Sequence, residues 1–195
     1  MIKDLSAPSL QLAAPRPATW LRATGIAVGG SALVAVCAHI ALPLSISPVP
    51  LSMAPFAVLL LGLLLTPRLA AATLGAYLAQ GALGLPVFAP SGPAGLAHLL
   101  GPTGGYLLAY PFAAALVSFL WRQTGRSFTP AALSAAAGNA VILASGALWL
   151  AVLTHLSAQA ALTLAVVPFL PGDALKVVAA AGLAVGLSRL RRRAN

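Results

Sequence analysis

The sequence contains no glutamate, and its only acidic residues are Asp4 and Asp173. Charged residues of either sign make up 7% of the 195 residues, whereas a soluble domain carries roughly a quarter. Hydrophobic residues account for 60% of the chain, which leaves too little polar surface to face water on all sides and excludes an ordinary soluble domain. Cysteine is also nearly absent. With Cys37 alone, no disulfide or multi-cysteine metal site can form within one chain, and we expect Cys37 to pack against apolar neighbours.

The basic residues give a formal net charge of +9, which raises the question of a nucleic-acid partner. They stand in small clusters between long apolar runs, however, and not on one basic face interleaved with aromatic residues. This distribution is typical of the flanks of membrane spans. We therefore expect a lipid bilayer as the surrounding partner and no nucleic acid.

The chain divides into a polar, proline-punctuated stretch, residues 1–20, and an apolar remainder, residues 21–195. The first stretch lacks the apolar core of a cleavable signal peptide and is interpreted as a cytosolic tail. Residues 21–195 are interpreted as one membrane domain. Its apolar segments are 22–42, 51–65, 69–83, 105–121, 131–155 and 172–190. They predict an all-α membrane protein, a bundle of six transmembrane helices, although the second and third segments are shorter than the ~20 residues of a typical span.

The orientation follows from the positive-inside rule. With a cytosolic N-terminus and six crossings, ten of the eleven basic residues fall on the cytosolic side, and Lys176 is the exception. The ten are Lys3, Arg16, Arg22, Arg68, Arg122, Arg126, Arg189, Arg191, Arg192 and Arg193. The protein is thus predicted to lie in the inner (cytoplasmic) membrane with both termini in the cytosol. Residues 43–50, 84–101 and 156–168 are then exposed on the outer side.

The predicted outer connections look chemically specific. Three prolines in residues 43–50 oppose a regular helix and demand an ordered or extended loop. Residues 84–104 are rich in glycine and proline yet still hydrophobic, unlike a merely solvated loop. We expect this segment to fold back over the protein as a lid or pocket wall.

Asp173 and Lys176 stand at the start of the last span. Asp173 directly follows Pro171-Gly172, so it is predicted at or near the helix N-cap, with Lys176 one turn on and on the same face. The simpler interpretation is a capping aspartate that pairs with a lysine. A lysine in a first turn opposes the helix dipole and is costly at membrane depth. One carboxylate facing two positive potentials therefore favours an anionic or strongly hydrogen-bonding ligand.

The run GPTGGY at residues 101–106 precedes the fourth span. Its adjacent glycines, Gly104 and Gly105, allow backbone N–H groups to approach a ligand, although the run also suits an ordinary helix-entry turn. It lacks the Lys-[ST] pair of a Walker A loop, and we predict no nucleotide site. Tyr77, Gln80 and Asn139 either line a pocket or bridge helices. The histidines lack metal-ligand spacing and are interpreted as interfacial; they are His39, His98 and His155.

Three separated motifs together resemble the signature of the BioY family. They are GLPVFA at residues 84–89, GPTGGY at 101–106 and PFLPGD at 168–173, the last followed by Lys176. The resemblance covers residues 47–176. Pro90-Ser91-Gly92-Pro93 replaces a glycine-rich stretch common in the family, and Met53 stands where a glutamine is frequent.

The resemblance implies a six-helix S-component that binds biotin near the outer face. Its implied partners are a transmembrane coupling protein and two ATPase subunits of an ECF-type transporter. Biotin is then the ligand, and the resemblance implies that the protein has no cofactor and no enzymatic activity. Asp173 is suited to the urea N–H groups, and Lys176 to the carboxylate or the urea oxygen. The substrate-binding residues so predicted are Asp173, Lys176, Thr103, Gly104, Gly105, Tyr106, Phe88, Phe169, Tyr77 and Asn139.

Other functions stay open at this stage. A solitary carrier or facilitator for biotin or another small carboxylated vitamin is the stronger rival, and a homo-oligomer is not excluded. An intramembrane enzyme would have to rely on a Ser–His or a lysine-based site.

Small residues recur every fourth position along the first span, at Ala23, Ala27, Ser31 and Ala35. Such a ridge allows close approach of another helix. The family resemblance implies docking on the coupling protein through Ala23, Ala27 and Ser31. The alternative is packing inside the protein's own bundle.

Overall fold

Helices make up nearly all of the regular structure in the computed structural model, which describes residues 17–125 and 127–193. In chain order the elements are α1 (Pro17–His39), β1 (Ala41–Leu42), β2 (Leu51–Ser52), α2 (Ala54–Leu64), α3 (Pro67–Ala82), α4 (Leu96–Leu99), α5 (Gly104–Arg122), α6 (Phe128–Thr154), α7 (Ala158–Ala165), the 3-10 helix η1 (Val167–Phe169) and α8 (Leu170–Arg193). Each predicted apolar segment overlaps with one of the helices α1, α2, α3, α5, α6 and α8. Most of the predicted tail, residues 1–16, lies outside the described residues, and α1 begins at Pro17.

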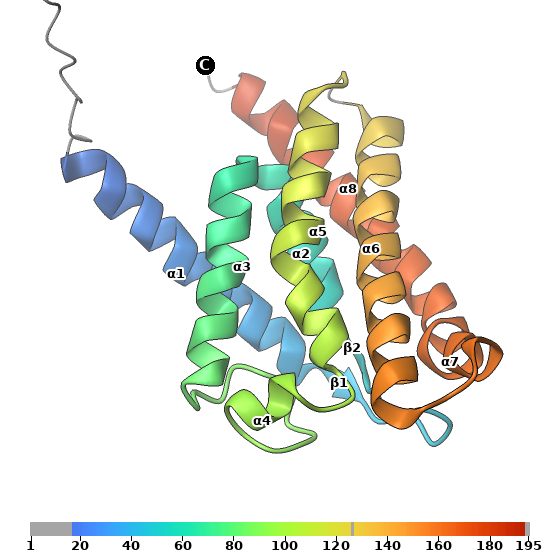
Figure 1. Ribbon diagram of the computed structural model, residues 1–195. Helices are drawn as coiled ribbons and strands as arrows, with labels where there is room; N and C mark the ends of the chain where they lie inside the picture. The colour runs from blue at the N-terminus through green and yellow to red at the C-terminus, as the bar shows by residue number, and fades with distance from the viewer. Residues whose placement is uncertain (1–16, 126, 194–195) are drawn as a thin grey trace, which may run out of the picture.

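The six longer helices pack in two layers (Figure 1). One layer consists of α3, α5 and α6, and the other of α1, α2 and α8. Between the layers, α1 contacts α3, α2 contacts α5, and α8 contacts α6. Helix α2 is the central element of its layer, because it contacts α1 and α8 on either side and also reaches α6.

Helix α2 is short, uniformly apolar and almost completely buried. Its Gly62 allows close contact with α5, since a Cβ at this position would lie 2.8 Å from Cβ of Val117. Small residues at helix crossings are typical of membrane bundles, where close van der Waals packing drives association. Helix α3 follows after a turn that ends at Thr66, whose side chain accepts a hydrogen bond from the Leu69 N–H at 3.4 Å.

Four helical segments of the described structure are long and apolar enough to cross a membrane. They are Trp20–His39, Gly104–Arg122, Phe128–Thr154 and Ala158–Leu190. Helices α2 and α3, with 11 and 16 residues, are shorter than the ~20 residues that a perpendicular span requires. The structure is thus that of a multi-pass helical membrane protein, and the count of six crossings stays a prediction.

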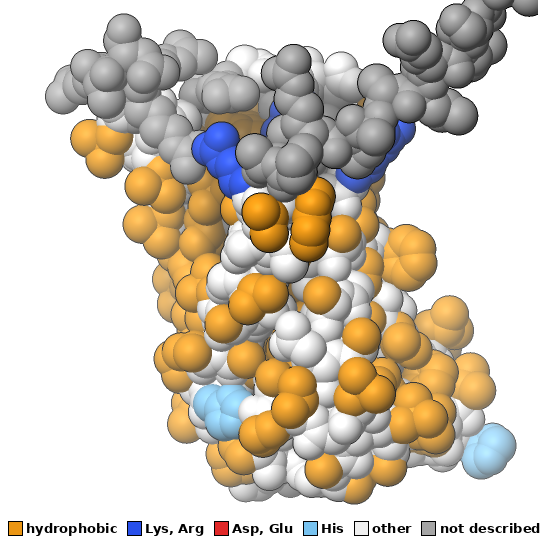
Figure 2. All heavy atoms as spheres, turned by 90° about the vertical axis from the view of Figure 1, so that its left-hand side faces the viewer, with side chains coloured by type: hydrophobic (Ala, Val, Ile, Leu, Met, Phe, Trp, Pro, Cys, Tyr) orange, Lys and Arg blue, Asp and Glu red, His pale blue; other side chains and the backbone are white. Residues whose placement is uncertain are grey.

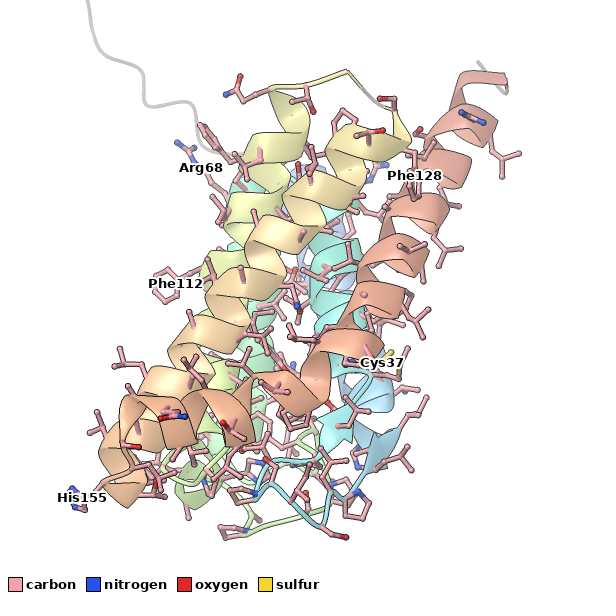
Figure 3. All side chains as sticks on the ribbon, turned by 90° about the vertical axis from the view of Figure 1, so that its right-hand side faces the viewer. Cys37, Arg68, Phe112, Phe128 and His155 are labelled. Atoms are coloured by element: carbon pink, nitrogen blue, oxygen red, sulfur yellow. The ribbon has the colours of Figure 1, made fainter. Side chains whose placement is uncertain are left out.

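The described chain begins and ends at the same end of the bundle (Figure 1). Exposed arginines occur at this end, near the starts of α1 and α3 and near the ends of α5 and α8; they are Arg22, Arg68, Arg122 and Arg189. Figure 2 shows Lys and Arg side chains at one end of a largely apolar face and histidine at the other end. Figure 3 likewise places Arg68 and His155 at opposite ends. Charge and fold therefore define two distinct ends of the molecule.

The ridge of small residues on α1 faces partly into the bundle. Ser31 is 1% exposed and accepts a hydrogen bond from Gln80 Nε2 of α3 at 3.0 Å. The adjacent Gly30 is equally enclosed, because a Cβ there would press on Thr73 of α3. This contact corrects the docking prediction for Ser31, whose side chain is covered by the protein's own helix. Ala23 and Ala27 are half-buried, and for them docking stays a prediction.

Candidate ligand-binding site

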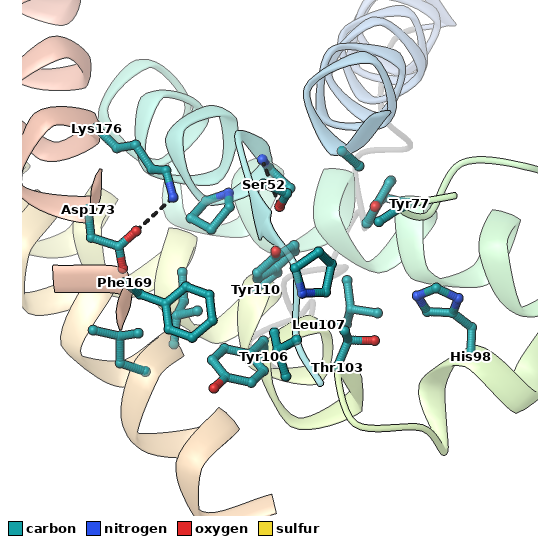
Figure 4. A pocket seen from close by; sticks show the side chains of 18 residues that line it. Ser52, Tyr77, His98, Thr103, Tyr106, Leu107, Tyr110, Phe169, Asp173 and Lys176 are labelled. Carbon is teal, nitrogen blue, oxygen red and sulfur yellow. Dashed lines mark hydrogen bonds and ion pairs between the residues drawn. The ribbon is translucent and has the colours of Figure 1, made fainter. Parts of the chain in front are cut away.

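A cavity lies between the two helical layers at the end opposite the arginines (Figure 4). The free space that it encloses is about 50 Å³. Its wall is mostly apolar and aromatic, with a few polar groups. The polar side chains that line it are those of Ser52, Tyr77, His98, Thr103, Tyr106, Tyr110, Asp173 and Lys176.

Asp173 and Lys176 form an ion pair in the cavity wall. Lys176 Nζ lies 2.7 Å from Asp173 Oδ1, and the side chains are only 5–6% exposed. Helix α8 begins at Leu170, so Asp173 occupies its first turn and not the N-cap that the Pro171-Gly172 pair suggested. The pair neutralises both charges, as burial in a low-dielectric environment requires. Among the described residues only Asp173 bonds the ammonium, whose other N–H groups are available to a ligand.

The side chains of Tyr77 and Tyr106 line the cavity, and their hydroxyls form hydrogen bonds to the connections that cover its outer side. Tyr77 Oη donates to the Val87 carbonyl at 3.1 Å, in the connection between α3 and α4. Tyr106 Oη donates to the Ala165 carbonyl at 2.6 Å, at the end of α7. Both outer connections are thereby attached to helices of the bundle, which keeps Phe169 of η1 over the cavity.

The connection between α3 and α5 folds back over the bundle, as its hydrophobic composition predicted. The Phe88 ring packs edge-on against Tyr77 at 5.4 Å between centroids and also contacts the His98 ring at 5.0 Å. Gly81 leaves the space that the Phe88 ring occupies, since a Cβ there would collide with that ring. Phe88 therefore supports the wall from behind, while Ala89 and His98 reach the cavity itself.

His98 is a cavity residue, although its lack of metal-ligand spacing favoured an interfacial position. It is 4% exposed and lines the cavity, whereas His39 and His155 are exposed, as an interfacial position predicts. His98 Nδ1 lies 3.0 Å from the Pro93 carbonyl. Because a carbonyl only accepts, Nδ1 carries the hydrogen, and in the neutral ring Nε2 is left as an acceptor. The sequence signal was its position between two motifs in an unusually apolar connection.

The predicted glycine contacts do not reach the cavity. Gly104 and Gly105 lie where α5 approaches α6, and a Cβ on Gly105 would collide with Trp149. Ser145 Oγ of α6 donates to the Gly105 carbonyl at 2.9 Å, so this backbone is used for helix packing. Thr103, one residue before, does line the cavity.

The other predicted residues divide into two groups. Those that line the cavity with Thr103 are Tyr77, Tyr106, Phe169, Asp173 and Lys176, whereas Phe88 and Asn139 stand behind the wall. The lining residues not predicted from the sequence are mainly apolar; besides His98 they are Ala38, Val49, Pro50, Ser52, Ala54, Pro55, Ala89, Leu107, Tyr110, Ile142 and Leu143. An apolar wall residue within an apolar span carries no sequence signal, because packing and ligand contact favour the same side chains.

Comparison with known proteins gives consistent results. A family model described as the BioY family matches residues 10–193. A probable biotin transporter BioY of Pyrococcus horikoshii is 41% identical over 150 residues, covering 76% of this chain and 85% of that protein. The biotin transporter BioY2 of Lactococcus lactis subsp. cremoris is 34% identical over 169 residues, covering 85% and 90%.

The fold is also similar to a solved structure, that of the S-component for biotin from an ECF-type ABC transporter. The TM-score is 0.81, with 24% identity, over 90% of this chain and 95% of the other. At this identity the likeness establishes the shared fold. The family resemblance deduced from the three sequence motifs is confirmed by the family model and the relatives.

Proposed function

Because this chain belongs to the BioY family, we propose that it captures biotin in the cavity next to Asp173 and Lys176 and serves in its uptake across the membrane. The observation that carries the proposal is the buried ion pair in a mostly apolar and aromatic cavity. The relatives named as biotin transporters supply the identity of the ligand. The role is transport, without a catalytic step.

The chemistry of biotin suits this wall. Its bicyclic ring system is partly apolar, which is compatible with the aromatic side chains of Tyr106, Tyr110 and Phe169 in the wall. Its urea has two donors and one acceptor, and its chain ends in a carboxylate. The free N–H groups of Lys176 can donate to either the urea oxygen or the carboxylate. In a small-molecule site, a small number of polar groups in a mostly apolar cavity usually sets the orientation of the ligand and the specificity of binding.

The cavity opens toward the exterior in this proposal. The arginine-bearing end faces the cytosol, as the positive-inside rule favours, and both termini lie there. All six longer helices cross the inner membrane, with residues next to α2 and α3 completing the two short spans. The cavity, at the opposite end, then meets biotin before transport.

Active uptake requires partners in this scheme. The chain serves as the S-component of an ECF-type transporter, with a transmembrane coupling protein and ATPase subunits that supply the energy. Two observations support this role: the fold is that of a named S-component, and the sequence has no Walker A motif of its own. The rival is a solitary carrier, which reconstitution in liposomes with and without partners would distinguish by biotin accumulation.

Equilibrium binding of labelled biotin to the purified chain in detergent tests the proposed function. We expect saturable binding that unlabelled biotin displaces and that a vitamin of unrelated shape, such as thiamine, does not. Absence of saturable biotin binding by a chain that elutes as a folded species would contradict the proposal.

A further inference from the structure

Asn139 contacts the ion pair from a different helix. It lies on α6, and its Nδ2 donates to Asp173 Oδ2 of α8 at 3.1 Å. The other oxygen of the carboxylate, Oδ1, accepts from Lys176 Nζ at 2.7 Å. Asn139 is 7% exposed and is not among the residues that line the cavity. The three side chains thus form a chain of hydrogen bonds that ends at the cavity with Lys176.

Asp173 and Lys176 alone do not determine their own geometry. Both stand on α8, one turn apart, and a single contact at Oδ1 leaves the carboxylate free to rotate. The amide of Asn139 engages Oδ2 from α6 and fixes the plane of the carboxylate. A charge-assisted hydrogen bond of this kind is stronger than a neutral one. The position of the Lys176 ammonium, and of its free N–H groups, therefore depends on a residue of another helix.

The orientation of the Asn139 amide has a free-energy cost. A carboxylate only accepts, so the NH₂ group of Asn139 must face Asp173, and its Oδ1 points elsewhere. Within the described part of the chain this buried oxygen has no hydrogen-bond partner. Leaving a buried acceptor unpaired is unfavourable, and a leucine of similar volume would avoid this cost. Packing alone therefore does not explain an asparagine here.

We propose that Asn139 is a positioning residue that acts on the ligand through Asp173. It holds the carboxylate so that Lys176 presents its remaining N–H groups to the cavity, without itself touching the ligand. This inference rests on the proposed function, because biotin binding is the property that Asn139 supports. It also replaces the direct ligand contact that the family resemblance implied for Asn139.

A double-mutant cycle separates this role from a structural one. N139A is measured in the wild-type and D173A backgrounds, with S134A as the matched control. Ser134 is also buried on α6, but its hydroxyl donates to the Pro130 carbonyl of its own helix and not to Asp173. We expect N139A to weaken biotin binding roughly 10- to 100-fold in the wild-type background and less than about twofold in D173A. S134A should change binding less than about twofold in either background.

Equal losses in both backgrounds, or no loss in the wild-type background, would overturn the inference. If N139A does not fold, N139L fills the same space without a donor and serves in the same cycle. A wild-type chain that binds no biotin would overturn the proposed function and this inference with it. Wild-type binding combined with an additive cycle would overturn the inference alone.

Discussion

Lys176 Nζ lies 2.7 Å from Asp173 Oδ1, one turn apart on α8, and both side chains are buried against one cavity. Two opposite charges at this depth neutralise each other but retain directional donors and acceptors. Such a pair can orient a polar ligand within an apolar wall without introducing a net charge into the membrane domain.

The first prediction concerns this pair. Lys176→Ala and Asp173→Asn should each weaken biotin binding by roughly 2–4 kcal/mol, because each leaves a buried partner or ligand group unpaired. Equilibrium binding in detergent is the measurement. Arg68→Ala, at the opposite end of the bundle, is the control and should bind as the wild type does. Wild-type affinity in both pair variants would reduce the pair to a structural role.

The second prediction concerns the cover of the cavity. Gly81→Ala places a methyl group against the Phe88 ring, which packs on Tyr77, and should destabilise the fold by about 1–3 kcal/mol while weakening biotin binding. Gly75→Ala on the same helix is the control, because the added Cβ meets no atom within 4 Å beyond the adjacent residues and the backbone of its own helix. Thermal unfolding and biotin titration of both variants provide the comparison. Equal behaviour of the two would show that the Phe88 contact is unimportant.

The third prediction concerns His98. His98→Ala removes a cavity-lining ring and its bond to the Pro93 carbonyl, and should weaken biotin binding by about 1 kcal/mol. His155→Ala, an exposed histidine outside the cavity, should leave binding unchanged. Both variants are compared by biotin titration at one pH. A larger effect of His155→Ala would contradict the assignment.

The fourth prediction concerns topology. In a Cys37→Ser background, Ser91→Cys should react with a membrane-impermeant thiol reagent added from outside, because residue 91 is exposed at the cavity end. Thr124→Cys, exposed in the turn after α5 at the arginine end, should react only after the membrane is permeabilised. The reverse pattern would invert the orientation and place the cavity toward the cytosol.

The fifth prediction separates docking from packing on α1. In Ala27→Trp the added bulk points partly outward, so biotin binding should persist while co-purification with the partner subunits and ATP-dependent uptake fall. Ser31→Trp should instead damage folding and binding together, because Ser31 is buried against Gln80. If Ala27→Trp also loses binding and folding, the ridge packs within the bundle at that position too.

Much of the architecture followed from the sequence, because membrane insertion depends on long apolar segments and on the charges beside them. The ends of the helices differ from the predicted segments by at most five residues. Asp173 and Lys176 were singled out because a charged group is conspicuous in an apolar chain, whereas Thr103 came from the family resemblance. The fold-back of residues 84–104 was also anticipated, from a connection too hydrophobic to be solvated.

The tertiary structure alone decided which residues surround the cavity. Asn139 and Asp173 are 34 residues apart in the sequence. Only the packing of α6 against α8 brings the Asn139 amide to the Asp173 carboxylate, where it binds the carboxylate and does not line the cavity. Gly104 and Gly105 proved to serve helix packing, and His98 proved to be buried, because side-chain environment depends on which helices meet. The sequence by itself determined a multi-helix membrane protein with one buried charged pair. The packing of its helices determined the site. Sequence periodicity cannot predict that packing, because every face of these helices is hydrophobic.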